Sequence, residues 1–383
     1  MKIAVVGGGS TYSPELVDGF ARLFPDVREL VLIDPARERL DVVGPFAARI
    51  FSHYGHAGQV TFTTDLDAGL ADASVVVIQL RVGGQQARIS DETFPLECGC
   101  IGQETTGAGG LAKALRTVPV VLDVAERAAR LAAPGAWIVD FTNPVGIVTR
   151  ALLDAGHRAV GLCNVAIGFQ RRFAAMLGVP PEAVILDHVG LNHLTWERAA
   201  YVDGVDRLPE LLSAHLQDFA DDLDMPAPVL STLDCVPSYY LRYFYCHDAV
   251  VLLGQRGGAF YSEAAVGLIG SLLSGDGQVH SANVRNHGHL PFLPDDAVIE
   301  VSCRVDKDGP APVPITPVGP LQSGLIAHVS AYEELAVAAA VHGGRSRVYR
   351  ALLAHPLVGQ HDVADALTDK LLAANTAYLA WAR

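Results

Sequence analysis

A glycine-rich turn close to the N-terminus could bind a dinucleotide. The sequence GGGST at Gly7 to Thr11 follows the apolar run KIAVV and precedes a helical pattern, so its backbone amides could approach a pyrophosphate at a helix N-terminus. Asp34 ends the next apolar run, where a carboxylate can accept hydrogen bonds from the adenosine ribose and repel a 2′-phosphate. Three glycines alone could form only a tight turn, but Asp34 favours a nucleotide site, and NAD over NADP.

A further polar position follows a later apolar run. Asn143 lies in FTNPV, where hydroxyacid dehydrogenases have an asparagine beside the nicotinamide, although Asn-Pro is also a common turn dipeptide. An NAD-linked hydroxyacid dehydrogenase is therefore one hypothesis. The residues expected to bind the cofactor are Gly7, Gly9, Ser10, Thr11, Asp34 and Asn143.

The elements that must position these residues alternate between strand and helix. Apolar runs such as KIAVV, ELVLI and SVVVI are separated by helical patterns over 14–23 and 36–54, which is typical of a parallel sheet covered on both faces. The same rhythm continues through AWIVDFTNP, AVGLCNV and VILDHVGLNHL. After about residue 165 the pattern becomes mainly helical, with an antiparallel patch near AVIEVSCRV and a proline-rich turn region over 309–320.

These patterns predict an α/β fold in two domains. Residues 1–163 are expected to form a Rossmann-type, NAD-binding parallel sheet like that of lactate and malate dehydrogenases. Residues 164–383 are expected to form a mainly helical α+β domain for catalysis, substrate binding and oligomerisation.

Bulk composition limits the class of protein. The 383 residues are 50% hydrophobic, enough for a large core, and the net charge of −14 argues against a nucleic-acid partner. No run approaches the roughly 18 to 20 apolar residues of a membrane span, and the N-terminus is unlike a secretory signal. Six cysteines scattered along a long chain do not form a disulfide framework. We expect a soluble cytoplasmic protein with reduced thiols, no nucleic-acid or membrane partner, and a small-molecule substrate.

Nine further segments carry a more specific signal. In chain order they are GGGSTYSPEL, QLRVGGQQARISDE, GCIGQETTGAGG, FTNPVG, GLCNVAIG, GLNHLTW, YLRYFY, QRGGAFYSEAA and AHPLV. Together they resemble glycoside hydrolase family 4, and most of all its 6-phospho-β-glucosidase branch, over nearly the whole chain. The resemblance implies an NAD- and metal-dependent glycosidase that acts on a sugar phosphate and forms a homodimer or homotetramer.

The resemblance implies that Cys163 and His193 bind a divalent metal, usually manganese. Each residue stands at the end of an apolar run. A thiolate with an imidazole would leave coordination positions open for substrate oxygens. Considered singly, a cysteine in an apolar run is more often a core residue, and His193 could lie in a turn. The pairing of GLCN with GLNHL favours the metal.

The resemblance also implies a mechanism without the pair of carboxylates common in glycosidases. The sugar is oxidised transiently at C3, which makes the C2 proton acidic enough for a side-chain base, and the glycosidic oxygen is eliminated before water adds. By the motif match Tyr240 is that base, with Tyr243 as the reserve choice. A tyrosine of pKa about 10 then needs a nearby metal or cation, for which Arg242 is a candidate. The alternative is that these tyrosines only pack together.

Substrate preference depends on a few polar residues. Family members for α-linked substrates have an aspartate as general acid where this chain has Asn164, and an amide cannot protonate a leaving group, so β-linked substrates are favoured. Arg88 and Arg256 match best as phosphate ligands, although each could form a surface salt bridge. Glu104 and Asp91 could hold a water or a sugar hydroxyl, or be solvated loop carboxylates. The expected substrate-binding residues are Arg88, Asn143, Asn164 and Arg256, with Tyr240 and Asn164 at the catalytic centre.

The chain departs from the family pattern at three places. Ala166 and Tyr239 stand where prolines are usual, and the stretch between Tyr245 and Arg256 is shorter than usual. The shorter stretch leaves the leaving-group preference, the oligomeric state and the phosphate requirement open. The alternatives are a family 4 enzyme for unphosphorylated or uronic acid glycosides, the hydroxyacid dehydrogenase, and an NAD sensor without catalysis.

Overall fold

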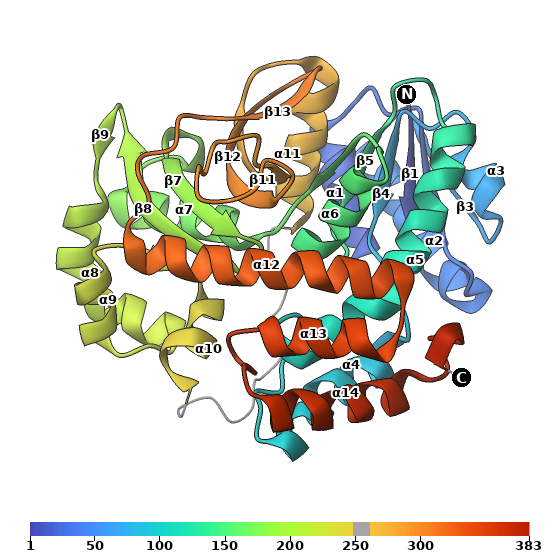
Figure 1. The fold of residues 1–383 in the computed structure, drawn as a ribbon. Helices are drawn as coiled ribbons and strands as arrows, with labels where there is room; N and C mark the ends of the chain where they lie inside the picture. Colours follow the sequence, from blue (N-terminus) through green and yellow to red (C-terminus); the bar gives the residue numbers. More distant parts are fainter. Residues whose placement is uncertain (248–260, 383) are drawn as a thin grey trace.

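One mixed sheet runs through the molecule in the computed structural model, which describes residues 1–247 and 261–382 (Figure 1). Across the described residues the order is β10-β8-β7-β12-β11-β6-β5-β4-β1-β2-β3, with β13 paired to β12 and β9 to β8. The strands are β1 (Lys2–Val6), β2 (Glu29–Ile33), β3 (Gln59–Thr63), β4 (Val75–Ile78), β5 (Trp137–Asp140), β6 (Ala159–Gly161), β7 (Ile185–Leu191), β8 (Leu194–Val202), β9 (Val205–Asp206), β10 (Val236–Pro237), β11 (Val279–Arg285), β12 (Val298–Asp306) and β13 (Gly309–Pro312).

Helices surround this sheet. They are α1 (Ser13–Leu23), α2 (Arg37–His53), α3 (Leu66–Leu70), α4 (Gly84–Thr93), α5 (Gly107–Leu131), α6 (Val145–Asp154), α7 (Val165–Leu177), α8 (Leu208–Leu223), α9 (Ala227–Leu233), α10 (Arg242–Tyr245), α11 (Tyr261–Ser274), α12 (Pro320–His342), α13 (Arg345–Ala354) and α14 (His361–Asn375). Helix α1 packs against α2 and α11, whereas α5 packs against α3, α6 and α12. Helix α12 crosses the molecule from the α8 side to α5 (Figure 1).

The N-terminal half of the sheet is parallel, as predicted. Strands β6, β5, β4, β1, β2 and β3 pair in parallel in that order. Every residue of β4 is buried, which explains its continuous β-branched sequence VVVI. Strand β3 was not predicted, because its sequence QVTFT is half polar and lies at the edge of the sheet, where one face needs little apolar cover.

The C-terminal half of the sheet is antiparallel. Strands β11, β12 and β13 form the expected antiparallel patch. The segment VILDHVGLNHL was expected to continue the parallel rhythm, and that expectation was wrong. Strand β7 instead forms a hairpin with β8 through a two-residue turn and pairs antiparallel with β12. A two-residue connection can only join antiparallel strands.

The two halves meet at the end of β6. Gly161 of β6 pairs antiparallel with Asn283 of β11, so the loop that begins at Leu162 leaves the parallel half beside β11, β12 and β7. This junction brings the turn after β7 close to the loop after β6.

Among the helices that the structure describes, one has the length and composition of a membrane span, although the sequence predicts no such segment. Helix α12 has a window of mean hydropathy 1.3, half of which is buried inside the protein. Its contacts with α5, α6 and α13 account for that apolar surface as in an interior helix.

Candidate active site

The glycine-rich turn packs too closely on neighbouring strands for any side chain. Gly7 has a φ of +88°, and a Cβ there would lie 2.3 Å from the Gln79 carbonyl oxygen. A Cβ on Gly8 would lie 2.7 Å from the Cα of Leu32 in β2. The turn is therefore held at the carboxyl ends of β1, β2 and β4, where an open parallel sheet binds ligands.

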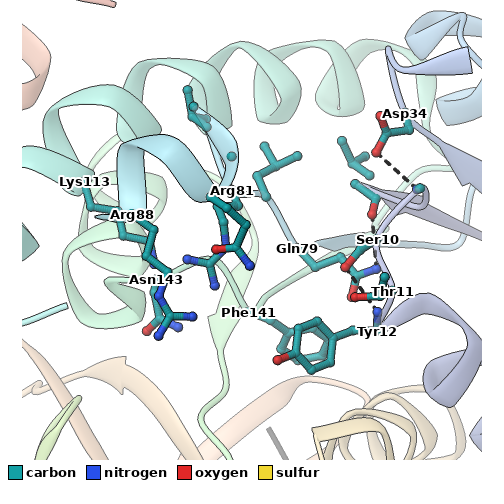
Figure 2. Close-up of a pocket in the computed structure, with 18 of the residues that line it drawn as sticks. Ser10, Thr11, Tyr12, Asp34, Gln79, Arg81, Arg88, Lys113, Phe141 and Asn143 are labelled. Carbon is teal, nitrogen blue, oxygen red and sulfur yellow. Dashed lines mark hydrogen bonds between the residues drawn. The ribbon is translucent and has the colours of Figure 1, made fainter. Parts of the chain in front are cut away.

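Asp34 completes this end of the site. Its Oδ2 accepts a hydrogen bond from the Gly9 amide at 3.1 Å and its Oδ1 accepts one from the Ala36 amide at 2.9 Å. The side chain is buried and lines a cleft of about 1390 Å³. Ser10 and Thr11 line the same cleft (Figure 2). All the predicted cofactor residues line this cleft, and they are Gly7, Gly9, Ser10, Thr11, Asp34 and Asn143.

The opposite end of the cleft holds the predicted reaction centre. Asn143, Asn164 and Tyr240 line it together, although they follow β5, follow β6 and precede α10. The Oδ1 of Asn143 is buried and has no hydrogen-bond partner within the described chain. An unpaired buried carbonyl of this kind fits a missing donor such as a nicotinamide amide.

Cys163 lies close to the β7–β8 turn that carries His193, and neither residue is among those that line the cleft. Asn192, which precedes His193 in the β7–β8 turn, hydrogen-bonds to the sulfur of Cys163. Burial raises the pKa of the Cys163 thiol above its ordinary value, and the charge of Glu300 adds to that effect. Burial lowers the pKa of His193 to about 4, so the imidazole is neutral at neutral pH. A bound cation would favour the thiolate and leave the neutral imidazole as a ligand.

The surroundings of His193 fit a metal ligand. Both ring nitrogens are buried and neither has a hydrogen-bond partner among the residues that the structure describes. Its φ of +63° is uncommon for a residue other than glycine. No cluster of three or more His, Cys, Asp or Glu side chains in the described ranges is arranged to hold a metal. Cys163 and His193 therefore suit a site that takes its other ligands from substrate or water.

Tyr240 lies directly on His193. The two rings are stacked, with centroids 3.7 Å apart and an interplanar angle of 17°. Tyr239 and Tyr243 flank Tyr240 with centroids at 4.3 Å and 6.4 Å, and all three line the cleft. The tyrosines thus do pack together, as the alternative reading held, but their stack also lies against the predicted metal ligand.

A buried hydrogen-bond network supports the β7–β8 turn from behind. His188 bonds to Glu197 at 2.7 Å and to Glu300 at 3.1 Å, and Glu300 accepts hydrogen bonds from Asn192 and Asn283. Burial alone would lower the pKa of His188, but the two carboxylates outweigh it and raise that pKa to about 10. The resulting imidazolium and the amides hold the pKa of Glu300 below its ordinary value. The network fixes Asn192, and with it the position of His193.

Charged side chains gather at one wall of the cleft. Glu104 is paired with Arg81 at 2.5 Å, Lys113 at 2.8 Å and Arg88 at 3.4 Å. Arg88 also pairs with Glu92 at 2.9 Å. Burial opposes ionisation of Glu104, but the three cations lower its pKa to about 2. Figure 2 shows Arg81, Arg88, Lys113 and Asn143 grouped on the side of the cleft opposite Asp34.

Of three further charged residues singled out in the sequence, two form ion pairs and one lies outside the described residues. Asp91 was a candidate to hold a water or a sugar hydroxyl, but it is fully buried and makes a bidentate pair with Arg116 at 2.9 and 2.5 Å. Arg242 pairs with Asp224 at 2.9 Å and lies over the Tyr243 ring. Arg256, and most of the shortened stretch before it, lie outside the described residues.

Several residues at the site were not predicted from the sequence. Lys113 and Arg81 line the cleft, and Glu300 and His188 support it. Lys113 could have been found, because a single charge in the apolar stretch GAGGLAKAL of α5 requires a buried partner. His188 and Glu300 are 112 residues apart, and their pairing has no local signal.

Comparisons with known proteins bear on this site. The sequence pattern described as "Family 4 glycosyl hydrolase" matches residues 2–179, and "Family 4 glycosyl hydrolase C-terminal domain" matches residues 188–358. The "Probable 6-phospho-beta-glucosidase" of Bacillus subtilis (strain 168) is 35% identical over 99% of this chain and 97% of its own length.

Solved structures agree with the sequence matches. The structure of a 6-phospho-beta glucosidase from Thermotoga maritima, with manganese, NAD⁺ and glucose-6-phosphate, has a TM-score of 0.89 and 32% identity and covers 99% of both chains. A malate dehydrogenase from Salinibacter ruber has a TM-score of 0.60 at 18% identity, covering 90% of this chain and 97% of its own, which is a likeness of fold. The predicted combination of a Rossmann-type sheet with a C-terminal α+β part is confirmed.

Proposed function

The chain belongs to family 4 of the glycosyl hydrolases, and from that membership we propose that it hydrolyses 6-phospho-β-glucosides with NAD and a divalent metal, by transient oxidation of the sugar at C3. The relatives from Bacillus subtilis and Thermotoga maritima carry names of this activity, and the latter was solved with NAD⁺, manganese and glucose-6-phosphate. The cleft of this chain is lined by the residues expected to bind NAD and the sugar, which supports the proposal.

One observation carries the proposal most directly. A buried imidazole with two unpartnered nitrogens, His193, lies against Tyr240 at one end of a cleft whose other end is the glycine turn and Asp34. A simple dehydrogenase needs no such combination of a neutral imidazole, a thiol at Cys163 and a stacked phenol. The combination suits deprotonation of a carbon beside a carbonyl.

Each residue has a role in this proposal. Asp34 would accept hydrogen bonds from the ribose, and Asn143 would orient the nicotinamide and the substrate. Cys163 and His193 would hold the metal, and Tyr240 would remove the C2 proton. When bound, NAD would supply a reversible hydride acceptor and the metal a Lewis acid.

The substrate anomer follows from Asn164. Its amide lines the cleft after β6, where it can hydrogen-bond a sugar oxygen but cannot donate a proton to a leaving group. We therefore assign β-linked substrates whose leaving group needs no strong general acid.

A second candidate is a family 4 glycosidase for unphosphorylated or uronic acid glycosides. Arg88, the described phosphate candidate, already pairs with Glu92 and Glu104, and Arg81 and Lys113 share Glu104. Three cations against two carboxylates leave one net positive charge for an anionic substrate. Because these cations already pair with carboxylates, a substrate phosphate should contribute less to binding than it would beside two arginines without such partners.

The test uses purified protein with NAD, Mn²⁺ and four aryl glucosides, α or β, with or without a 6-phosphate. We expect release of the aglycone from the 6-phosphorylated β-compound, with no accumulation of NADH. A chelator should abolish the activity and added Mn²⁺ should restore it, whereas the Cys163→Ser variant should stay inactive at the same Mn²⁺ concentration. Net NADH without aglycone would support a dehydrogenase instead, and equal rates with and without phosphate would support the second candidate.

A further inference from the structure

A second, very small cavity lies next to His193, apart from the main cleft. Its volume is about 30 Å³, which is enough room for an ordered water molecule. Helix α12 forms one wall with Tyr332 and Glu333, and the β7–β8 turn forms another with His193. Its lining residues also include Thr105, Thr106, Pro144, Asn192, Phe244 and His355.

Polar atoms without partners surround this cavity. The Oη of Tyr332, the Oε2 of Glu333 and both ring nitrogens of His193 are buried, and none has a hydrogen-bond partner in the described part of the chain. The three residues are only 4 to 5% exposed. Leaving a buried polar group unpaired destabilises a protein, so several such groups around one small cavity point to a common partner. A single water makes two to four hydrogen bonds and can satisfy them together.

We propose that the cavity holds one ordered water that accepts a hydrogen bond from His193 and donates one to Glu333, which makes Glu333 a positioning residue for the metal ligand. The inference rests on the proposed function, in which the other nitrogen of His193 binds the metal. A neutral imidazole with one nitrogen on a metal carries its proton on the second nitrogen, and that N–H requires an acceptor. The Tyr332 hydroxyl can complete the shell of the water.

The surrounding fold gives Glu333 its place. A Cβ on Gly146, in the FTNPVG segment, would lie 2.8 Å from the Oε1 of Glu333, so glycine there leaves room for the carboxyl group. Burial raises the pKa of Glu333 to about 8, and Arg150 only partly offsets this. A carboxyl group that keeps its proton can remain in this interior without an ion pair and still accept a hydrogen bond through its carbonyl oxygen.

Metal binding tests the proposal directly, without reference to turnover. Mn²⁺ is titrated into metal-free protein in the presence of NAD, and free Mn²⁺ is followed by electron paramagnetic resonance. Glu333→Leu removes the acceptor, so the Mn²⁺ affinity should fall about tenfold or more, the usual cost of losing such a partner. NAD affinity should stay unchanged, which a general loss of structure would not allow. Glu333→Gln keeps a carbonyl oxygen and should recover most of the affinity.

A matched control is the next residue on the same helix. Glu334 has a side chain that is 62% exposed and pairs with Arg150, and it does not line the cavity. Glu334→Leu should leave Mn²⁺ affinity unchanged. Equal Mn²⁺ affinity in Glu333→Leu and the wild type would overturn the inference while leaving the proposed function in place, whereas a wild type that binds no Mn²⁺ would overturn both.

A high-resolution crystal structure of the wild type decides independently of any variant. One water bonded to both His193 and Glu333 supports the inference. A dry cavity, or a direct contact between the two side chains, overturns it even if Glu333→Leu fails to fold.

Discussion

The stacking of Tyr240 on His193 links two residues whose proposed roles are different. With ring centroids 3.7 Å apart, the phenol lies within the field of any cation bound by the imidazole. A nearby cation favours an ionised tyrosine, which is the form needed to remove a proton. The stack also fixes the orientation of the Tyr240 ring, so base and metal would move as a unit.

Replacing the Tyr240 phenol should remove the proposed base without disturbing the fold. Tyr240→Phe keeps the ring stacked on His193 and removes only the oxygen, so we expect unchanged folding and NAD binding. Loss of a general base costs about 10² to 10⁴ in rate. The measurement is kcat with an aryl 6-phospho-β-glucoside, together with exchange of the substrate C2 hydrogen with deuterated water, and both should fall in parallel.

Tyr239→Phe is the matched control for this change. Tyr239 is an adjacent cleft-lining tyrosine whose ring centroid lies 4.3 Å from that of Tyr240. It should keep C2 exchange and most of the activity. If Tyr239→Phe or Tyr243→Phe lost exchange while Tyr240→Phe kept it, the base would have to be reassigned.

Individual site residues could be predicted from the sequence only where they lie in a recognisable local motif. Cys163, Tyr240 and the residues of the glycine turn lie in short segments with distinctive neighbours. Glu333 lies in the apolar helix sequence AYEELAVAAA, where one of two adjacent glutamates is buried and the other is exposed. Only the packing of α12 against β7, with the β7–β8 turn across the small cavity, distinguishes them, and that packing has no local signature.

The glycine turn shows how the elements set the site. Its position depends on contact with the backbone of β2, since a Cβ on Gly8 would overlap the Cα of Leu32 at 2.7 Å. The backbone of β2, which is paired on both sides by β1 and β3, cannot move aside as a flexible side chain can. The turn and the strand therefore act as one rigid surface for the pyrophosphate.

Gly8→Ala should weaken both folding and cofactor binding. Overpacking of this kind costs about 1 to 3 kcal/mol of stability, and displacement of the turn should lower NAD affinity as well. Calorimetry of NAD binding and thermal unfolding measure the two effects. Gly168→Ala is the control: this helix α7 position has open space around its Cβ, so the variant should bind NAD normally and be equally or slightly more stable. Normal NAD affinity in Gly8→Ala would show that the turn does not bind the cofactor.

Which strands could be predicted from the sequence depends on how deeply they are buried. Buried parallel strands such as β1, β2 and β4 were predicted because both of their faces need apolar residues. Strand direction was not predictable for β7, because its sequence ILDHVGL suits either direction and the two-residue connection to β8 sets it. Strand β3 has little burial and thus little sequence signal.

The whole molecule joins its two halves through one continuous sheet. The predicted boundary at residue 163 falls just beyond β6, where parallel pairing gives way to antiparallel pairing with β11. The proposed metal ligands Cys163 and His193 come from opposite sides of this boundary, so the proposed site needs both parts of the chain. The alignment with the Bacillus subtilis relative spans 431 positions, more than the 383 residues here, so this chain lacks segments present in that relative.

Acid stability should report on the charged wall of the cleft. Glu104 ties together the loop after β4 through Arg81, helix α4 through Arg88 and helix α5 through Lys113. Its pKa is lowered from 4.5 to about 2 in the folded protein. A carboxylate with a depressed folded pKa stabilises the fold fully above its unfolded pKa, and this contribution is lost as the pH falls through the folded pKa.

The Glu104→Gln variant should isolate that contribution. At pH 7 we expect the free energy of unfolding of the variant to lie on the order of 3 kcal/mol below that of the wild type. This gap in stability should close as the pH falls from about 5 toward 2. Urea unfolding at a series of pH values measures the gap. Glu97→Gln is the control, because Glu97 pairs with Lys370 on the surface with 64% of its side chain exposed, and such pairs contribute little at any pH. A gap that stays constant with pH would mean that Glu104 stabilises the fold through packing and that its charge does not contribute.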